Sequence, residues 1–303
     1  MALLSNVPLF PEFRQVAIAD GVIFHKLFQE YPPVISEYTF TNIFAWIPQY
    51  DFQIARKNEM VVVLTKFCGH GGFYPPIGPR SGEGIFLLLK ESARLGIADH
   101  FHCADETIVS SLETFKAELL INEDEDQFDY VYLREDLINL SGNRFHDKKN
   151  LLRQFERKYD ATFEPLTVAT IEEALKFEHS WCTTRECEKD PRLSKEMCAI
   201  YRMLSHFEVL RLAGAAVRFG GKIIGITMGE PLNEDTYVVH VEKADDKYRG
   251  IYQFINQRFA ASIDSKYMWI NREQDLGIPG LRRAKQSYNP ARMGKKYIVK
   301  LVH

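Results

Sequence analysis

The sequence lacks any hydrophobic run long enough to cross a membrane. No stretch of its 303 residues approaches the roughly 20 consecutive apolar residues that a membrane-spanning helix requires. The first residues, MALLSNVPLFPEFR, also lack the basic segment followed by an apolar core that marks a secretory signal. These absences predict a soluble protein of the cytoplasm.

Cysteine is scarce, and its spacing fits neither of its usual structural uses. The five cysteines are odd in number and irregularly spaced, which predicts a reducing compartment and not a disulfide framework. His179, Cys182, Cys187 and Cys198 are residue types that bind zinc, but their spacing matches no zinc-binding pattern. We therefore expect ordinary thiols and no metal site.

An excess of basic charge is also absent from the chain as a whole. The formal net charge of −3 gives no signal for nucleic-acid binding over the entire surface. Acidic residues are, however, missing from Leu276 to His303. The basic residues of this segment are Arg282, Arg283, Lys285, Arg292, Lys295, Lys296 and Lys300. The segment is either a solvated basic tail or an anion-binding surface.

What the sequence does contain is ample material for a core, with 46% hydrophobic and 13% aromatic residues. The length accommodates two domains. In residues 160–303, hydrophobic periodicity and turn signals predict the order strand, two helices, three strands, helix, strand, helix, strand. Three consecutive strands in an otherwise alternating chain argue against a Rossmann sheet. This order of elements is that of the GNAT acyltransferase fold.

The first half shows a weaker form of the same order. Two helical stretches and two strands precede a loop rich in Gly and Pro, Gly69–Gly84, and one strand of the pattern stays uncertain. We therefore predict an α/β (α+β) protein with tandem GNAT-like domains and mixed central sheets. Its parts are an N-terminal domain over 1–142, a linking helix over 143–159 and a C-terminal domain over 160–303.

In a GNAT-type fold the sheet splays after its fourth strand, and the next helix directs free backbone N–H groups into the gap. Such a helix N-terminus is a natural anion site. Here the segment contains Lys247, Arg249 and Gly250. It matches the acetyl-coenzyme A pattern R/Q-x-x-G-x-G/A only in part, because Tyr252 stands where a small residue lets a pyrophosphate approach. That departure counts against coenzyme A.

The strand before this helix offers two candidate general bases. The alternation of side chains along Thr236–Lys243 places His240 and Glu242 on one face, near the expected splay. For Glu242 the alternative is an ion pair with a local cation. For His240 the alternative is an imidazole whose hydrogen bonds are all made within the core.

Residues after the fifth strand extend the candidate site. Asp275 either orients a substrate amine or fixes a loop by ion pairs. On the following helix Arg282 and Lys285 share a side, and Tyr288 closes the turn before Pro290. With Arg283, these side chains suit a grip on phosphates, with Tyr288 as a stacking surface or proton donor. The alternative is basic side chains that pair with the helix C-terminus.

Three stretches carry a resemblance to a known family. They are NRFHDKKNLLRQFERKY, VHVEKA and YMWINREQDLGIPGLRRAKQSYNP, and together they resemble the C-terminal domain family of phosphatidylglycerol lysyltransferases. Leu281, Lys285, Tyr288 and Pro290 fit an L-x-x-x-K-x-x-aromatic-x-P run of that family. The resemblance implies a tandem GNAT-like fold, as in the Fem transferases of peptidoglycan synthesis. It also implies transfer of an amino acid from aminoacyl-tRNA to a lipid or a cell-wall amine.

Three functions stay open at this point. The first is an aminoacyl-tRNA-dependent transferase that needs no cofactor, with tRNA as the donor carrier. In it Glu242 or His240 is the base, Asp275 orients the ammonium group, and the 3′ end of the tRNA is held by Arg283, Lys285 and Tyr288. Basic side chains of the linking helix, among them Lys148, Lys149 and Arg153, would extend the track for the RNA. The second is an N-acyltransferase that uses acetyl-coenzyme A, and the third is a binding module without catalysis.

Overall fold

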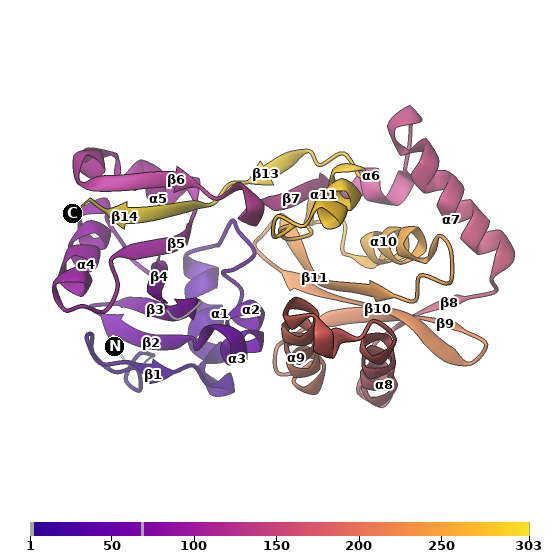
Figure 1. Ribbon diagram of the computed structural model, residues 1–303, viewed down its shortest axis with the longest axis horizontal. Helices are drawn as coiled ribbons and strands as arrows, with labels where there is room; N and C mark the ends of the chain where they lie inside the picture. Colours follow the sequence, from indigo (N-terminus) through magenta and orange to yellow (C-terminus); the bar gives the residue numbers. More distant parts are fainter. Residues whose placement is uncertain (1–2, 68–69, 303) are drawn as a thin grey trace. The chain divides into compact units, whose positions relative to one another are not determined.

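The computed structural model describes residues 3–67 and 70–302 of the chain (Figure 1). The chain forms two compact units. Unit 1 consists of Met1–Asp129 and Gly294–His303, and unit 2 consists of Tyr130–Met293. Each unit is built around its own seven-stranded sheet.

The sheet of unit 1 has the strand order β1–β2–β3–β4–β5–β14–β6, in which β4 and β5 are parallel and the other neighbours antiparallel. The strands are β1 (Arg14–Gln15), β2 (Gln53–Lys57), β3 (Met60–Phe67), β4 (His70–Ile77), β5 (His100–Ala104), β6 (Leu119–Glu123) and β14 (Tyr297–Leu301). The helices are α1 (Gly21–Glu30), α2 (Phe40–Ala45), α3 (Ile47–Tyr50), α4 (Gly82–Arg94) and α5 (Glu106–Ser111). Helix α4 packs its apolar face, with Ile85, Leu88 and Leu89, on Phe73 and Phe101 of the sheet.

The sheet of unit 2 has the order β13–β7–β12–β11–β10–β9–β8, with β11 and β12 parallel. Its strands are β7 (Asp129–Leu133), β8 (Thr162–Pro165), β9 (Ala213–Phe219), β10 (Lys222–Pro231), β11 (Thr236–Ala244), β12 (Trp269–Asn271) and β13 (Arg292–Gly294). Its helices are α6 (Arg134–Asn139), α7 (His146–Lys158), α8 (Val168–Thr184), α9 (Pro191–Ser205), α10 (Ile251–Ser262) and α11 (Pro279–Gln286). Figure 1 shows α8 and α9 on one face of this sheet and α10 on the other.

Local sequence signals account for the main turns of unit 2. Gly220 and Gly221 both have positive φ, 57° and 77°, and they form the tight turn between β9 and β10. Helix α9 begins with Pro191 after Asp190, whose side chain accepts a hydrogen bond from the backbone N–H of Arg192. Helix α8 begins at Val168, with Thr167 as its N-cap and Thr170 in its first turn.

The two units exchange one strand each. Strand β14, at the end of the chain, lies between β5 and β6 of unit 1, whereas β7, from the first half, pairs with β12 of unit 2. Buried Lys296 fixes β14 in unit 1 through ion pairs of 2.6 Å to Glu37 and 2.7 Å to Asp129. The compact units therefore do not coincide with the predicted boundaries of 1–142, 143–159 and 160–303, because strand pairing across the sequence is not visible in local periodicity.

Among the described residues, the elements absent from the prediction are four strands and two short helices, namely β1, β4, β6, β13, α3 and α6. Strand β4 lies inside the segment interpreted as a loop, because its Gly and Pro residues conceal the strand pattern. Strand β6 follows α5 and a 3₁₀ turn. Helix α6 follows β7 directly.

The cysteines depart from the prediction at one place. Cys182 and Cys187 form a disulfide, with Cα atoms 5.1 Å apart, where Glu186 adopts a left-handed conformation after α8. The expectation of ordinary thiols is therefore wrong for this pair, while Cys103 and Cys198 are free thiols. Cys68 lies outside the described residues. No helix among the described residues is both long and apolar enough to span a membrane.

Candidate functional site

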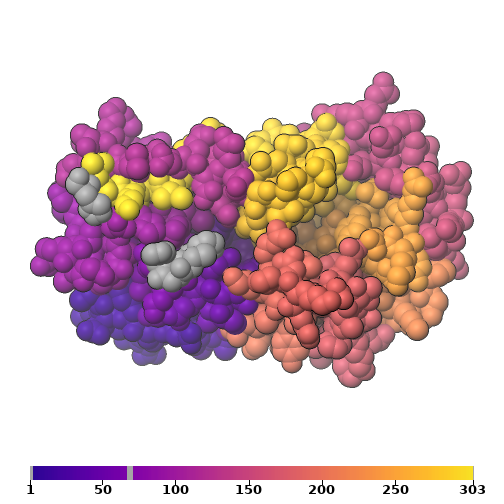
Figure 2. Space-filling view, in the orientation of Figure 1, coloured from indigo at the N-terminus to yellow at the C-terminus, as the bar shows by residue number. Residues whose placement is uncertain are grey.

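The sheet of unit 2 opens at one place, between β11 and β12. These strands pair only through Thr236–Trp269, Tyr237–Ile270 and Val238–Asn271. Strand β11 then continues to Ala244, whereas β12 ends at Asn271. The side chains of β11 beyond Val238 therefore face the residues that follow β12. In Figure 2 the surface of unit 2 is recessed between the yellow atoms near the C-terminal end and the salmon atoms of α8 and α9.

A β-bulge marks the start of this opening. Met228 pairs with Val241 and Gly229 with Val239, so His240 is the extra residue of β11. Val239 packs in the core cluster that contains α10, and Glu242, three residues later, also contacts α10. Regular alternation would place these two side chains on opposite faces. The bulge therefore explains how Glu242 comes to face α10.

His240 is bonded on both sides of its buried ring. Its Nδ1 lies 2.8 Å from Glu273 and its Nε2 lies 3.0 Å from Glu230. Burial alone would lower the pKa of His240, but the hydrogen bonds and charges of the two carboxylates raise it to about 9. The ring is therefore cationic at neutral pH, with both N–H groups donating. In this arrangement His240 ties β10 to the loop after β12 and has no lone pair to accept a proton, unlike the predicted base.

Glu242 shares its carboxylate between two neighbours that the sequence did not single out as functional. One oxygen accepts a hydrogen bond of 2.9 Å from Arg272 Nη2, and the other accepts one of 3.1 Å from Asn256 Nδ2. Both alternatives foreseen for Glu242 thus stay open, because an ion pair and a position at the splay coexist. Asn256 points from α10, where a polar side chain beside Phe254 and Ile255 was the available signal.

Arg272 is a largely buried cation of the opening. Its side chain is 13% exposed, and its guanidinium lies 4.9 Å from the ring centroid of Tyr288 and 5.6 Å from that of Tyr132. Nη2 donates to Glu242, whereas the buried Nη1 has no hydrogen-bond partner among residues 3–67 and 70–302. Burial opposes the charge, but Glu242 reverses that effect and raises the pKa of Arg272. A largely buried cation next to the splay therefore keeps one N–H donor group without a partner in the described part of the chain.

Tyr288 lies between two cations. The guanidinium of Arg272 lies 4.9 Å from the centroid of the Tyr288 ring, and the ammonium of Lys148, on α7, lies 4.6 Å from it. Burial raises the pKa of the Tyr288 phenol well above its usual range, so the phenol stays protonated. Burial and the charge of Arg272 lower the pKa of Lys148. Among the predicted tRNA contacts, Lys148 is therefore the one that the structure brings to the opening.

Two residues predicted to bind a ligand, Asp275 and Lys285, instead form hydrogen bonds with other groups of the protein. Asp275 accepts hydrogen bonds from Tyr130 at 2.6 Å, from the Gly277 backbone at 2.8 Å and from Arg282 at 2.7 and 2.8 Å. These partners lower the pKa of Asp275 although burial opposes them. Its geometry is that of the predicted loop lock, and Arg282 is the partner cation.

Lys285 is likewise structural in this arrangement. The residue is 9% exposed, and its ammonium donates to the backbone carbonyls of Arg272, Glu273 and Gln274 at 2.5, 3.0 and 2.6 Å. It therefore fixes the backbone that carries Arg272. On the same helix Arg283 is exposed, as are Arg153 of α7 and, to a lesser degree, Lys149.

The predicted anion loop before α10 is packed against the protein. Gly250 has φ +94°, and a Cβ there would lie 2.3 Å from the carbonyl oxygen of Leu151. The Tyr252 hydroxyl donates to the Ala244 carbonyl oxygen at 3.1 Å. Lys247 and Arg249 are both exposed. Gly250 thus serves close packing against α7, and the Tyr252 side chain lies at the end of β11.

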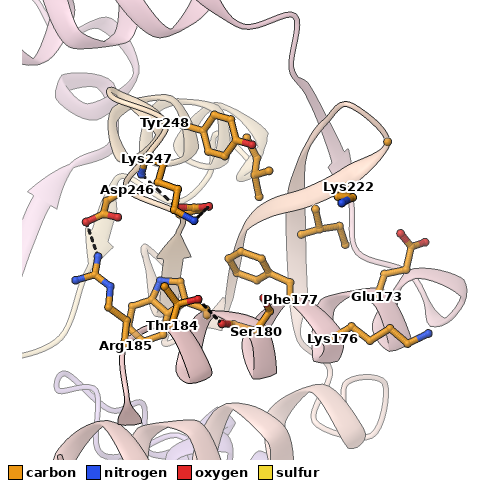
Figure 3. Close-up of a pocket in the computed structure, with 15 residues that line it drawn as sticks. Glu173, Lys176, Phe177, Ser180, Thr184, Arg185, Lys222, Asp246, Lys247 and Tyr248 are labelled. Carbon is orange, nitrogen blue, oxygen red and sulfur yellow. Dashed lines mark hydrogen bonds and ion pairs between the residues drawn. The ribbon is translucent and has the colours of Figure 1, made fainter.

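A pocket of about 380 Å³ lies beside this loop (Figure 3). Its walls come from α8, from the turn between β9 and β10, and from the residues after β11. Phe177, Trp181 and Ile224 supply apolar surface, and Lys222 and Lys247 supply positive charge. Figure 3 shows Arg185 paired with Asp246 across the end of the pocket, at 2.5 Å. Only the loop side of this pocket was foreseen from the sequence.

Comparison with known proteins identifies the relatives of this chain. The family model for the C-terminal part of phosphatidylglycerol lysyltransferase matches residues 28–300. A conserved protein of unknown function from Bacteroides thetaiotaomicron is 32% identical, with a TM-score of 0.89 over 96% of this chain and 99% of that one. An uncharacterized protein of Mycoplasmoides gallisepticum is 26% identical over 59% of this chain, and the match spans only 58% of that relative.

Two further solved structures share the fold at low identity. The L-PGS structure from Bacillus licheniformis is 12% identical, with a TM-score of 0.65 over 93% of this chain and 92% of that one. A tandem GNAT protein from the clavulanic acid biosynthesis pathway is 11% identical, with a TM-score of 0.50 over 96% and 98% of the two chains. These likenesses confirm the predicted tandem GNAT-like fold.

Proposed function

The chain belongs to the phosphatidylglycerol lysyltransferase C-terminal domain family, and from this premise we propose that it transfers an amino acid from aminoacyl-tRNA to an amine or hydroxyl acceptor. The acceptor would be a lipid or a cell-envelope precursor. The observation that supports the proposal is Arg272, a buried cation at the splay of β11 and β12 whose Nη1 has no partner in the described part of the chain.

An aminoacyl ester is already activated, so the protein needs to position the acceptor and stabilise developing charge. The acceptor nitrogen or oxygen attacks the ester carbonyl carbon, forming the new bond as negative charge gathers on the carbonyl oxygen. Arg272 Nη1 donates to that oxygen. Glu242 takes the proton of the acceptor and passes it to the ribose oxygen of the tRNA as the ester bond breaks.

Exposed basic side chains suit the tRNA. Lys149 and Arg153 of α7 and Arg283 of α11 all belong to unit 2 and leave their charges accessible to phosphates. Lys285 and Asp275 have their partners within the chain, so in this proposal they hold the loop that carries Arg272. In this proposal the acceptor binds in the opening between β11 and β12, and the tRNA binds to the exposed basic side chains.

Acetyl-coenzyme A fits this unit less well as a donor. A pyrophosphate in a GNAT-type fold needs close approach to the backbone before the helix that follows the fourth strand. Here the Tyr252 ring and the packing of Gly250 on Leu151 occupy that vicinity. We therefore propose that no cofactor takes part and that aminoacyl-tRNA is the donor substrate.

Transfer of radiolabelled amino acids from a charged total tRNA mixture tests the proposal. Phosphatidylglycerol vesicles and a lysine-containing pentapeptide serve as the two acceptor probes. We expect Arg272→Gln to lower the transfer rate about 10²–10³-fold, because it removes a donor to the developing oxyanion. Arg258→Gln is the matched control, since Arg258 forms an ion pair of similar length, 2.8 Å, with Glu156 on the surface of the same unit.

Binding of labelled tRNA across salt concentrations, with acetyl-coenzyme A as competitor, completes the test. Each phosphate contact contributes about 0.7–0.9 to the slope of log affinity against log salt, so Arg283→Ala together with Arg153→Ala should flatten it by about 1.5. Full transfer by Arg272→Gln would overturn the assignment of Arg272. Binding of acetyl-coenzyme A without tRNA binding would point to an N-acyltransferase, and tRNA binding without turnover would point to a non-catalytic module.

A further inference from the structure

Strand β5 of unit 1 carries two histidines on one face. Because side chains alternate along a strand, His100 and His102 share a face and Phe101 points to the other. Phe101 is fully buried in the core beneath α4. The two imidazoles therefore lie together on the opposite face of the sheet, and neither has a role in the proposed transfer reaction.

The Nε2 atoms of the two rings lie within hydrogen-bond distance of each other. These atoms are 3.0 Å apart, the ring centroids are 4.4 Å apart and the ring planes are at 89°. A straight hydrogen bond at this distance would separate the centroids by about 5 Å, because each centroid lies roughly 1 Å behind its nitrogen. The shorter centroid distance means that at least one of the two Nε2 atoms is not directed straight at the other.

This geometry agrees with that of two adjacent ligands of one metal ion. Nitrogens bound at about 2.0–2.1 Å in positions at right angles are about 2.9 Å apart. Right angles between ligands are the preference of square-planar, tetragonal or octahedral ions such as Cu²⁺ and Ni²⁺, for which imidazole is a suitable donor. Tetrahedral zinc would need a wider separation of about 3.4 Å.

The surroundings of the pair support the same role. Asp99 Oδ1 lies 2.7 Å from His100 Nδ1, which fixes the ring and leaves Nε2 as the coordinating atom, the carboxylate–histidine arrangement of many metal sites. Gly72 of the neighbouring strand has no side chain beneath the rings, where a Cβ would lie 2.3 Å from His102 Nε2 and 2.7 Å from His100 Nε2.

We propose that His100 and His102 bind one divalent copper or nickel ion through their Nε2 atoms. Within the described ranges no third His, Cys, Asp or Glu side chain completes a metal cluster, so water fills the remaining positions of the ion. The site belongs to unit 1 and is independent of the proposed transfer reaction in unit 2. Binding of the ion would involve none of the residues of the catalytic opening.

Calorimetric titration of the tag-free full chain with Ni²⁺ measures the binding. We expect one ion per chain, and at least tenfold weaker binding for His100→Gln and for His102→Gln. Asp99→Asn should weaken binding about tenfold, because it removes the carboxylate that orients His100. His179→Gln is the control for an exposed imidazole, and Cys198→Ser is the control for the exposed free thiol.

The Cu²⁺ adduct of the unmodified protein gives a second measurement that does not depend on the folding of any variant. Its electron paramagnetic resonance spectrum should show coupling to two imidazole nitrogens in the equatorial plane. A spectrum with fewer than two such nitrogens would overturn the proposal. So would the absence of Ni²⁺ binding at 100-fold excess, or equal binding by His100→Gln, His102→Gln and the unmodified chain.

Discussion

Replacement of Lys285 by methionine separates a structural role from a role in ligand binding. The ammonium donates to three backbone carbonyls in the loop after β12, and the side chain is buried. Hydrogen bonds to a charged group are worth about 1.5–3 kcal/mol each, so three give at least about 4.5 kcal/mol. Removing the ammonium also recovers part of the cost of burying it. We expect Lys285→Met to lower the free energy of unfolding of unit 2 by about 3 kcal/mol.

Urea unfolding followed by tryptophan fluorescence measures this loss, because Trp181 and Trp269 both belong to unit 2. Arg283→Met, on the exposed side of the same helix, is the matched control and should change stability by less than about 0.5 kcal/mol. Under conditions where both variants are folded, Arg283→Met should weaken tRNA binding more than Lys285→Met. A stability loss below about 1 kcal/mol for Lys285→Met would refute the structural interpretation of these three contacts.

Three further predictions concern other parts of the chain. The pKa of His240 is raised from about 6.5 to about 9 in the folded protein. Protonated His240 therefore stabilises the fold fully below pH 6.5, and this stabilisation is lost as the pH rises through 9. In urea midpoints measured from pH 6 to 10, His240→Gln should flatten that fall. Lys296→Ala leaves two buried carboxylates without their cation and should lower the thermal stability of unit 1 by about 3–5 kcal/mol in calorimetry. Trypsin cuts after Arg185, so mass spectrometry without reductant should find the Cys182 and Cys187 peptides joined, and separate peptides would contradict the disulfide.

Local patterns in the sequence predicted the order of elements in the second half except for the short strand β13. The Gly220–Gly221 turn and the apolar runs around it define β9 and β10, because these signals act within a few residues. Strand β4 was hidden since its glycines and prolines are rare in strands, yet pairing with β3 and β5 stabilises it. The exchange of β7 and β14 depends on contacts between distant segments, which no local pattern contains.

The candidate site was also predictable only in part. The sequence indicated the splay and placed Glu242 on the strand beside it, because the order of the strands locates that residue. It did not indicate that Lys285 points inward or that Arg272 lies on Tyr288, since both depend on the path of the loop after β12. The bulge at His240 was also unforeseen, because an extra residue in a strand leaves no sign in composition.

The position of β14 has a consequence for the order in which the chain can fold as it is synthesised. Unit 2 is continuous from Tyr130 to Met293, so all of its strands have been made before the last ten residues emerge from the ribosome. Unit 1 begins the chain but cannot close its sheet until β14 arrives between β5 and β6. Until then those two strands present unpaired edges, which are prone to association with other chains. The half that is translated first is therefore the half that is completed last.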